Sequence, residues 1–174
     1  ELTIRTIGAP RETRVLDVTI TPLPGQLTGT HLLLELADEG RAHGPLVDLG
    51  TGSGVLAIVA AKLGWRPVLG VDNAEPSVAA ARENAAANGA DVEVRLLDLR
   101  AEPPPAAPVA VANLTAPLLR ELAPRLPEET GVVVCSGLLA RERADVERAF
   151  ADAGFAPRDA RTEGDWAALL LARP

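Results

Sequence analysis

The sequence predicts an α/β fold: a doubly wound, mostly parallel sheet of seven strands that ends in an antiparallel hairpin. Three observations predict it. Short apolar runs alternate with helical segments from residue 45 onward. Three glycines at 50, 52 and 54 stand where the first strand would pass into the first helix. The last two strand-like runs are separated only by a short turn, so we expect them to pair antiparallel.

The first strand and the first helix have the clearest patterns. Residues 46–50, LVDLG, form a short apolar run that ends in glycine, as a buried strand does. Apolar residues then recur at i, i+3, i+4 and i+7 from Leu56 to Leu63, which predicts a helix with one apolar face. Gly64 follows and is expected to end that helix.

The remaining elements follow in order along the chain. Pro76 is expected to open the second helix, which continues to Gly89, and the proline-rich segment 100–108 excludes a long third helix. Leu139, Val146, Phe150 and Ala153 mark a further helix that ends at Gly154. The other predicted elements are strands at 67–72, 92–98, 109–114 and 131–137, a helix over 117–126, and a hairpin that turns at 163–165.

Residues 1–44 differ in pattern from the rest of the chain. The segments ELTIRTI and RVLDVTIT alternate like strands, and a capped helix is expected from about Thr30. This segment is too short to hold a core of its own. We therefore predict an N-terminal extension of strands and a helix over 1–44 and a catalytic domain over 45–174.

Composition weighs against several kinds of protein. The net charge is −7, and the cations are scattered arginines with a single lysine, whereas nucleic-acid-binding proteins usually carry a basic patch. Aromatic residues make up only 2% of the chain. No apolar run is long enough to cross a membrane. Cys135, the one cysteine, excludes an internal disulfide and a multi-cysteine zinc site, and we expect it to be a buried core thiol. We also expect no metal and a location in the cytoplasm, with which a single thiol is compatible.

The loop Gly50-Thr51-Gly52-Ser53-Gly54 predicts a cofactor site. In a doubly wound sheet, ligands bind beyond the carboxyl ends of the strands, and glycine lets a ligand approach the backbone closely. The helix that follows would direct free N–H groups at that ligand. The alternative is a plain turn between strand and helix. A dinucleotide fingerprint would need glycine at the position of Val55.

Acidic residues at three strand ends favour a cationic cofactor. Asp48 would repel a pyrophosphate and attract an ammonium group, and S-adenosylmethionine carries both a sulfonium and an amino group. Asp72, with Asn73 beside it, is placed to bind ribose hydroxyls, as acids in nicotinamide-binding proteins also are. Asp98 could accept a hydrogen bond from the adenine amino group, or it could be a solvated carboxylate.

These motifs resemble class I S-adenosylmethionine-dependent methyltransferases, and within them the PrmA family of ribosomal protein methyltransferases. The resemblance rests on LVDLGTGSGVLAIVAAKLG, VLGVDNAEPSVAAARENAAANG, VANLTAPLL, GDWAALLLAR and the upstream LTGTHLLLEL. It implies a Rossmann-like fold, S-adenosylmethionine as cofactor and S-adenosylhomocysteine as product. By resemblance, the methionine end of the cofactor contacts Asp48, Gly50 and Gly52, the ribose contacts Asp72, the adenine contacts Asp98, and the pocket is bordered by Thr30 and His31.

Asn113 takes the place of the family's motif asparagine after the fourth strand. Methyltransferases of glutamine amides or adenine amines carry Asn-Pro-Pro-aromatic there, whereas this chain has Asn113-Leu114-Thr115-Ala116 and no aromatic clamp. We therefore expect methyl transfer to an amine, of a protein such as a ribosomal protein or of a small molecule. Asn113 is the first candidate catalytic residue and His31 the second, although His31 could simply be a wall or surface histidine.

Other functions remain open on the sequence alone. An RNA or small-molecule methyltransferase could use the same loop, and a non-catalytic cofactor-binding scaffold would keep the fold. A nicotinamide oxidoreductase fits least well, because the glycine spacing differs from its fingerprint. The PrmA family also has a separate N-terminal domain that grips its ribosomal protein, whereas only residues 1–44 precede the predicted catalytic domain here.

Overall fold

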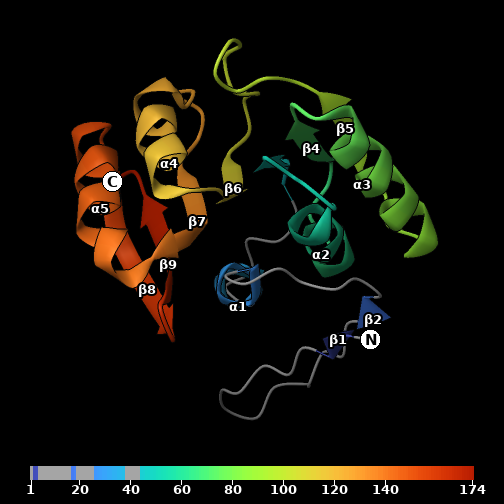
Figure 1. Ribbon diagram of the computed structural model, residues 1–174, viewed down its shortest axis with the longest axis horizontal. Coiled ribbons are helices and arrows are strands. Elements are labelled where there is room, and N and C mark those ends of the chain that lie inside the picture. The colour runs from blue at the N-terminus through green and yellow to red at the C-terminus, as the bar shows by residue number, and fades with distance from the viewer. Residues whose placement is uncertain (1, 4–16, 19–25, 38–43) are drawn as a thin grey trace.

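The computed structural model describes residues 2–3, 17–18, 26–37 and 44–174 (Figure 1). The strands are β1 Leu2–Thr3, β2 Asp17–Val18, β3 Leu46–Leu49, β4 Val68–Asp72, β5 Glu93–Leu96, β6 Val109–Asn113, β7 Val132–Leu139, β8 Ala156–Glu163 and β9 Trp166–Ala172. The α-helices are α1 Gln26–Leu36, α2 Val55–Leu63, α3 Glu75–Ala87, α4 Ala116–Leu122 and α5 Arg143–Asp152. Short 3-10 turns occupy Ala123–Arg125 and Ala140–Glu142.

The main sheet has seven strands in the order β5-β4-β3-β6-β7-β9-β8. Strands β3 to β7 pair in parallel, and β9 pairs antiparallel with both β7 and β8. The predicted fold class is therefore confirmed, including the hairpin at the C-terminal end. The strand order reverses at β3, which lies between β4 and β6, so the switch point falls where the glycine loop leaves the sheet.

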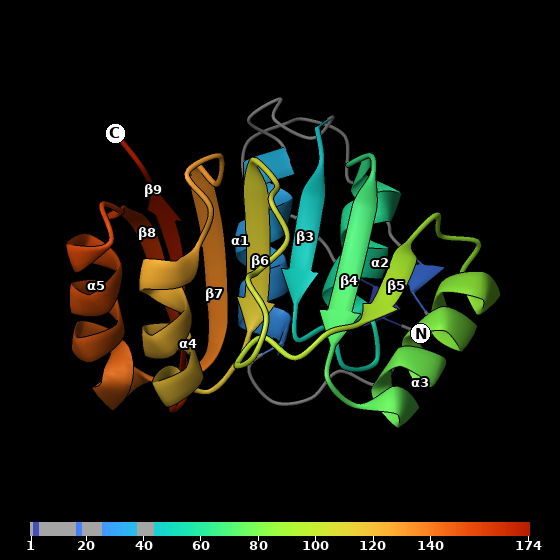
Figure 2. The same cartoon turned by 90° about the horizontal axis from the view of Figure 1, so that it is seen from above.

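Helices cover both faces of this sheet (Figures 1 and 2). Alternate residues of β6 face opposite ways: Val109 and Val111 join the core under α1 and α2, while Ala110 and Ala112 join the core under α4 and α5. Trp65 is buried in the first core and Phe150 in the second. Two apolar layers thus hold the central strands β3 and β6 between them, as their buried, mostly apolar sequences require.

A loop takes the place of a helix between β5 and β6, as the prolines predict. Residues 97–108 contain no helix, and Leu99 and Ala107 pack into the core beneath α4 and α5. Prolines 103–105 donate no backbone hydrogen bonds and so cannot extend a helical turn. The connection leaves β5 at the carboxyl edge, where residues 97–100 line a cavity with Gly50, and then crosses back to the amino end of the parallel strand β6 (Figure 2).

Two predicted elements are corrected by the structure. Helix α1 begins at Gln26, so Thr30 lies inside the helix and not at its start. The apolar residues Leu32, Leu33 and Leu36 are buried in the core on one face of the sheet, which stabilises this helix by packing. The strand-like segments expected in residues 1–7 and 14–21 fall mostly outside the described residues.

Leu139 lies in β7 and not in the helix predicted after it. It pairs with Trp166 of β9, and this antiparallel pairing extends β7 two residues past Gly137. Helix α5 begins at Arg143, after the turn Ala140–Glu142. A pairing partner that lies far along the chain leaves no local signal in the sequence, which explains the error.

Candidate functional site

The loop after β3 adopts a backbone that glycine favours. Gly50, Gly52 and Gly54 have φ angles of 76°, 54° and 88°. The N–H groups of Gly50 and Thr51 both donate to the carbonyl of Val71, at 2.9 and 2.8 Å, which ties the loop to β4. A Cβ atom on Gly50 would collide with the side chain of Leu114. The positive φ therefore calls for glycine at position 50, and a larger residue would also have to displace the end of the Leu114 side chain.

Asp48 holds the loop to the start of α2. Its Oδ2 accepts hydrogen bonds from Thr51 Oγ1 at 2.7 Å and from the Ala57 N–H at 3.1 Å. The residue before α2 is Gly54, which has no side chain, so Asp48 satisfies one of the free N–H groups of the first turn. Burial of the carboxyl group raises its pKa to about 6, against the opposing effect of these hydrogen bonds.

The raised pKa of Asp48 predicts a pH-dependent gain in stability for Asp48→Asn. In wild type, the folded protein binds the Asp48 proton more tightly than the unfolded chain does. Protonation of Asp48 therefore stabilises the wild-type fold fully below about pH 4, and this stabilisation is lost as the pH rises through about 6. A shift of this size corresponds to about 3 kcal/mol. The free energy of unfolding of the variant, relative to wild type, should therefore rise by about that amount between pH 4 and 7.

Denaturant titration at the two pH values measures this difference. The matched control is Asp91→Asn, because Asp91 is exposed. We expect its difference from wild type to stay constant over the same range. If the difference between Asp48→Asn and wild type did not change between the two pH values, the raised pKa of Asp48 would be contradicted.

Asp72, at the end of β4, is fixed by the glycine loop on one side and by the start of α3 on the other. Its Oδ2 accepts from the Gly52 N–H at 2.9 Å, and its Oδ1 accepts from the Ala74 N–H at 3.0 Å. A carboxylate has about four acceptor positions, so both oxygens can accept a further hydrogen bond from a ligand. The backbone thus orients this carboxylate in advance.

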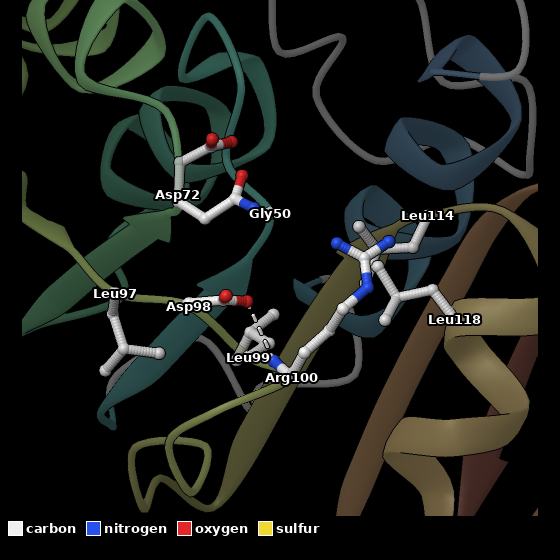
Figure 3. Close-up of a pocket in the computed structure, with 9 residues that line it drawn as sticks. Gly50, Asp72, Leu97, Asp98, Leu99, Arg100, Leu114 and Leu118 are labelled. Atoms are coloured by element: carbon white, nitrogen blue, oxygen red, sulfur yellow. Dashed lines mark hydrogen bonds between the residues drawn. The ribbon is translucent and has the colours of Figure 1, made fainter.

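A cavity of about 110 Å³ lies at the carboxyl ends of β3, β4, β5 and β6 (Figure 3). It brings together four of the predicted site residues: Gly50, Asp72, Asn73 and Asp98. Asp98 Oδ1 accepts the Arg100 N–H at 2.9 Å. The other lining residues are Leu97, Leu99, Arg100, Leu114 and Leu118. Two carboxylates beside a leucine-rich wall suit a ligand with both hydroxyl groups and an apolar ring.

Three predicted loop residues lie near this cavity without lining it. Gly52 does not line the cavity, but its N–H donates a hydrogen bond to Asp72, which does. Thr51 is buried against Gly70, and Gly54 is buried against Ala81 of α3. Like Asp48, Thr51 and Gly54 support the loop from beneath, so any cofactor contact they make stays a prediction.

Asn113 ends β6 next to the switch point, opposite Ser136 in the parallel register. Its side-chain oxygen lies against Gly137, which has a φ of 81° in the irregular stretch of β7 between Cys135 and Leu138. The Leu114 N–H donates to the Ser136 carbonyl at 3.0 Å. The asparagine is therefore held at the same edge of the sheet as the cavity, although it does not line it.

Thr30 and His31 lie on α1 and do not line the described cavity. Thr30 is buried, whereas His31 is exposed. The adjacent Gly29 lies so close to Ser136 that a Cβ atom there would come within 2.5 Å of the serine Oγ. Helix α1 thus reaches the end of β7 beside Asn113, and the predicted roles of Thr30 and His31 stay predictions.

Sequence reasoning missed Leu97, Leu99, Arg100, Leu114 and Leu118 as lining residues. Four of them could have been found, because they flank Asp98 and Asn113 at the ends of parallel strands, where a ligand edge is expected. Leu118 lies on α4, so only the packing of that helix reveals it.

The described part of the chain has neither a metal-binding cluster nor a membrane-spanning helix. No group of three or more histidine, cysteine, aspartate or glutamate side chains there has the arrangement of a metal site. Within the same residues, every helix is too short or too polar to cross a membrane.

Comparison with known proteins identifies the family. Residues 25–174 match the family described as ribosomal protein L11 methyltransferase (PrmA). The chain belongs to this family. A ribosomal protein L11 methyltransferase from Heliobacterium modesticaldum is 38% identical over 90% of the chain and 54% of its own length. One from Symbiobacterium thermophilum is 34% identical over 95% of the chain and 57% of its own length. The chain thus spans a little over half the length of these PrmA relatives.

Solved structures agree with this family and fold. A crystal structure of a ribosomal protein L11 methylase from Lactobacillus delbrueckii subsp. bulgaricus aligns with a TM-score of 0.73 and 34% identity, over 83% of this chain and 78% of that one. The magnesium protoporphyrin IX methyltransferase ChlM from Synechocystis PCC 6803, solved with bound SAM, gives a TM-score of 0.69 at 22% identity, over 86% and 79% of the chains. The second likeness shows the fold alone.

Proposed function

We propose that this PrmA-family chain is the catalytic part of an S-adenosylmethionine-dependent N-methyltransferase that acts on an amine of a ribosomal protein. The observation that carries the proposal is the joining of Gly50, Asp72 and Asp98 in one cavity at the switch point. Family membership supports methyl transfer as the chemistry of that cavity. A ribosomal protein substrate would place the reaction in the cytoplasm.

The residues of the cavity fit the cofactor. A Cβ atom on Gly50 would collide with the Leu114 side chain, so glycine lets the loop backbone and Leu114 line the cavity side by side. The fixed carboxylate of Asp72 would accept the ribose hydroxyls, and Asp98 would accept the adenine amino group. The buried carboxylate of Asp48 adds negative charge beneath the loop, which favours an ammonium and a sulfonium over a pyrophosphate. The bound cofactor supplies an activated methyl group, and its transfer needs no metal.

The chain's own residues have to bind a neutral amine and align it. Keeping a lysine amine with a pKa of about 10.4 neutral at pH 7.5 costs about 4 kcal/mol, while an α-amino group with a pKa of about 8 costs under about 1 kcal/mol. Alignment of the reacting groups can lower the barrier by roughly 7–11 kcal/mol. We propose that the Asn113 side-chain oxygen accepts an amine N–H and so orients the nitrogen lone pair.

Asn113→Ala tests this role. We expect kcat for methyl transfer to fall by roughly 100-fold, because a misplaced nucleophile loses about that factor, while the Kd for S-adenosylhomocysteine changes little. The matched control is Thr115→Ala in the same loop, since Thr115 is exposed and makes no capping hydrogen bond. A loss of binding as large as the loss of turnover would contradict the positioning role.

Methyl transfer from labelled S-adenosylmethionine tests the substrate class. The purified chain is incubated with a mixture of unmethylated ribosomal proteins, total RNA and small amines, and the three fractions are then separated. Label in a ribosomal protein, lost in Asn113→Ala, supports the proposal. Label in RNA or in small molecules, or no label above that of the variant, contradicts it.

We propose the division of the chain into an extension at 1–44 and a catalytic domain at 45–174. Helix α1 belongs to the extension by sequence, yet its residues Leu32, Leu33 and Leu36 are buried in the core shared with α2. The extension thus contributes a layer to the domain and has no separate core in its described part.

A further inference from the structure

Arg100 is the one cationic residue among the nine that line the cavity. Its backbone N–H donates to Asp98 Oδ1 at 2.9 Å, which fixes the start of the side chain beside the expected adenine position. Its guanidinium forms no hydrogen bond or ion pair within the described residues. An arginine placed in this way has its donors and its flat faces available for a ligand.

The Arg100 side chain extends across the cavity wall (Figure 3). It runs from the Asp98 end toward Leu114 and Leu118, and its guanidinium ends on the opposite side of the view from Asp72. In this view the guanidinium ends beside the Leu114 and Leu118 side chains, which line the same cavity. A ligand held by Asp72 and Asp98 would therefore have the guanidinium plane as a neighbour.

No aromatic ring is present among the lining residues to stack on a planar base. Trp65, Phe150 and Phe155 are buried in the cores. Proteins that bind a base commonly stack it on an aromatic side chain or on an arginine guanidinium. The guanidinium is planar and weakly hydrated, so it stacks readily on aromatic faces. Among the residues that line this cavity, Arg100 alone offers such a plane.

We propose that Arg100 is a specificity-determining residue that stacks its guanidinium on the adenine ring of the cofactor. This inference rests on the proposed function, because it takes S-adenosylmethionine as the ligand. Asp98 recognises the edge of the base through its amino group, and Arg100 recognises its face. The interaction involves adenine, so it is the same for the cationic cofactor and for its neutral product.

Stacking and a general charge effect predict different binding patterns. S-adenosylmethionine carries a positive sulfonium, S-adenosylhomocysteine has a neutral sulfur, and 5′-methylthioadenosine keeps the adenine, the ribose and a neutral sulfur but lacks the amino-acid part. Loss of a stacking partner weakens all three ligands alike. Loss of a repelling positive charge would instead strengthen the binding of S-adenosylmethionine and leave the two neutral-sulfur ligands nearly unchanged.

Calorimetric Kd values for these three ligands test the proposal in wild type, Arg100→Ala and Arg100→Lys. We expect Arg100→Ala to weaken each ligand by about fivefold, and Arg100→Lys, which keeps the charge without the plane, to remain weakened. The control is Arg95→Ala, which removes an arginine that is 57% exposed on β5 and paired with Glu93 outside the cavity. Its Kd values should match those of wild type.

The outcomes separate this inference from the proposed function. Wild-type affinity of Arg100→Ala for S-adenosylhomocysteine and 5′-methylthioadenosine overturns the stacking role while the proposed cofactor stands. Full recovery in Arg100→Lys also overturns it. A wild-type chain that binds none of the three ligands overturns the proposed cofactor site itself, and the role of Arg100 with it.

Discussion

Asp72→Ala is expected to weaken the binding of S-adenosylhomocysteine by at least about 100-fold. The carboxylate is already oriented by the Gly52 and Ala74 N–H groups, and the two ribose hydroxyls would each donate to it. A hydrogen bond to a charged group contributes about 1.5–3 kcal/mol, so the loss of two exceeds a factor of 100. Isothermal calorimetry with the purified chain measures the effect directly.

A matched control separates the site from a general change in charge. Asp91 is an exposed acid that does not line the cavity, so Asp91→Ala removes the same charge and should keep the wild-type Kd. Thermal unfolding of both variants checks that the fold is intact. An Asp72→Ala Kd within about threefold of wild type would show that the ribose does not bind at this carboxylate.

Gly137→Ala is expected to destabilise the fold by about 3 kcal/mol. Gly137 has a φ of 81°, where a side chain costs about 1–2 kcal/mol. Its Cβ would also collide with the Asn113 side-chain oxygen and would lie 2.9 Å from the Leu114 carbonyl oxygen. Overpacking of this kind adds about 1–3 kcal/mol, because backbone atoms cannot move aside as a flexible side chain can. Denaturant unfolding gives the difference in free energy.

The control for Gly137 is Gly89→Ala. Gly89 has a φ of 57°, and a Cβ there would meet nothing within 4 Å, so only the backbone strain remains. We expect a loss of about 1 kcal/mol for this variant. Equal losses in the two variants would mean that the contact between Gly137 and Asn113 contributes nothing. Because that contact positions Asn113, Gly137→Ala should also lower kcat for methyl transfer.

Local patterns in the sequence predicted most of the sheet and one wall of the site. The β3 strand, the glycine loop and α2 were predictable because glycine spacing and helical periodicity depend only on near neighbours. Asp72 and Asp98 were predictable as neighbours, since parallel strands bring their carboxyl ends to one edge. Their meeting in one cavity follows from the order of the strands.

The remaining features depend on contacts between distant parts of the chain. The extension of β7 through Leu139 depends on its pairing with β9, and the start of α1 depends on packing against β7. The sequence marked Asp48 as an acidic residue at a strand end. Only the structure shows that it accepts hydrogen bonds from Thr51 and Ala57 beneath the loop. Arg100 belongs to no sequence motif, so its position in the cavity could not be predicted. That position depends on the path of the proline-rich connection after β5.

A crystal structure of the chain with S-adenosylhomocysteine would show whether the cavity at the carboxyl ends of β3 to β6 is the cofactor site. We expect the ribose hydroxyls on the Asp72 carboxylate, the adenine amino group at Asp98, and the Arg100 guanidinium over the adenine face. Density for the ligand elsewhere on the molecule, or ribose bound away from Asp72, would contradict the assignment of this cavity as the cofactor site.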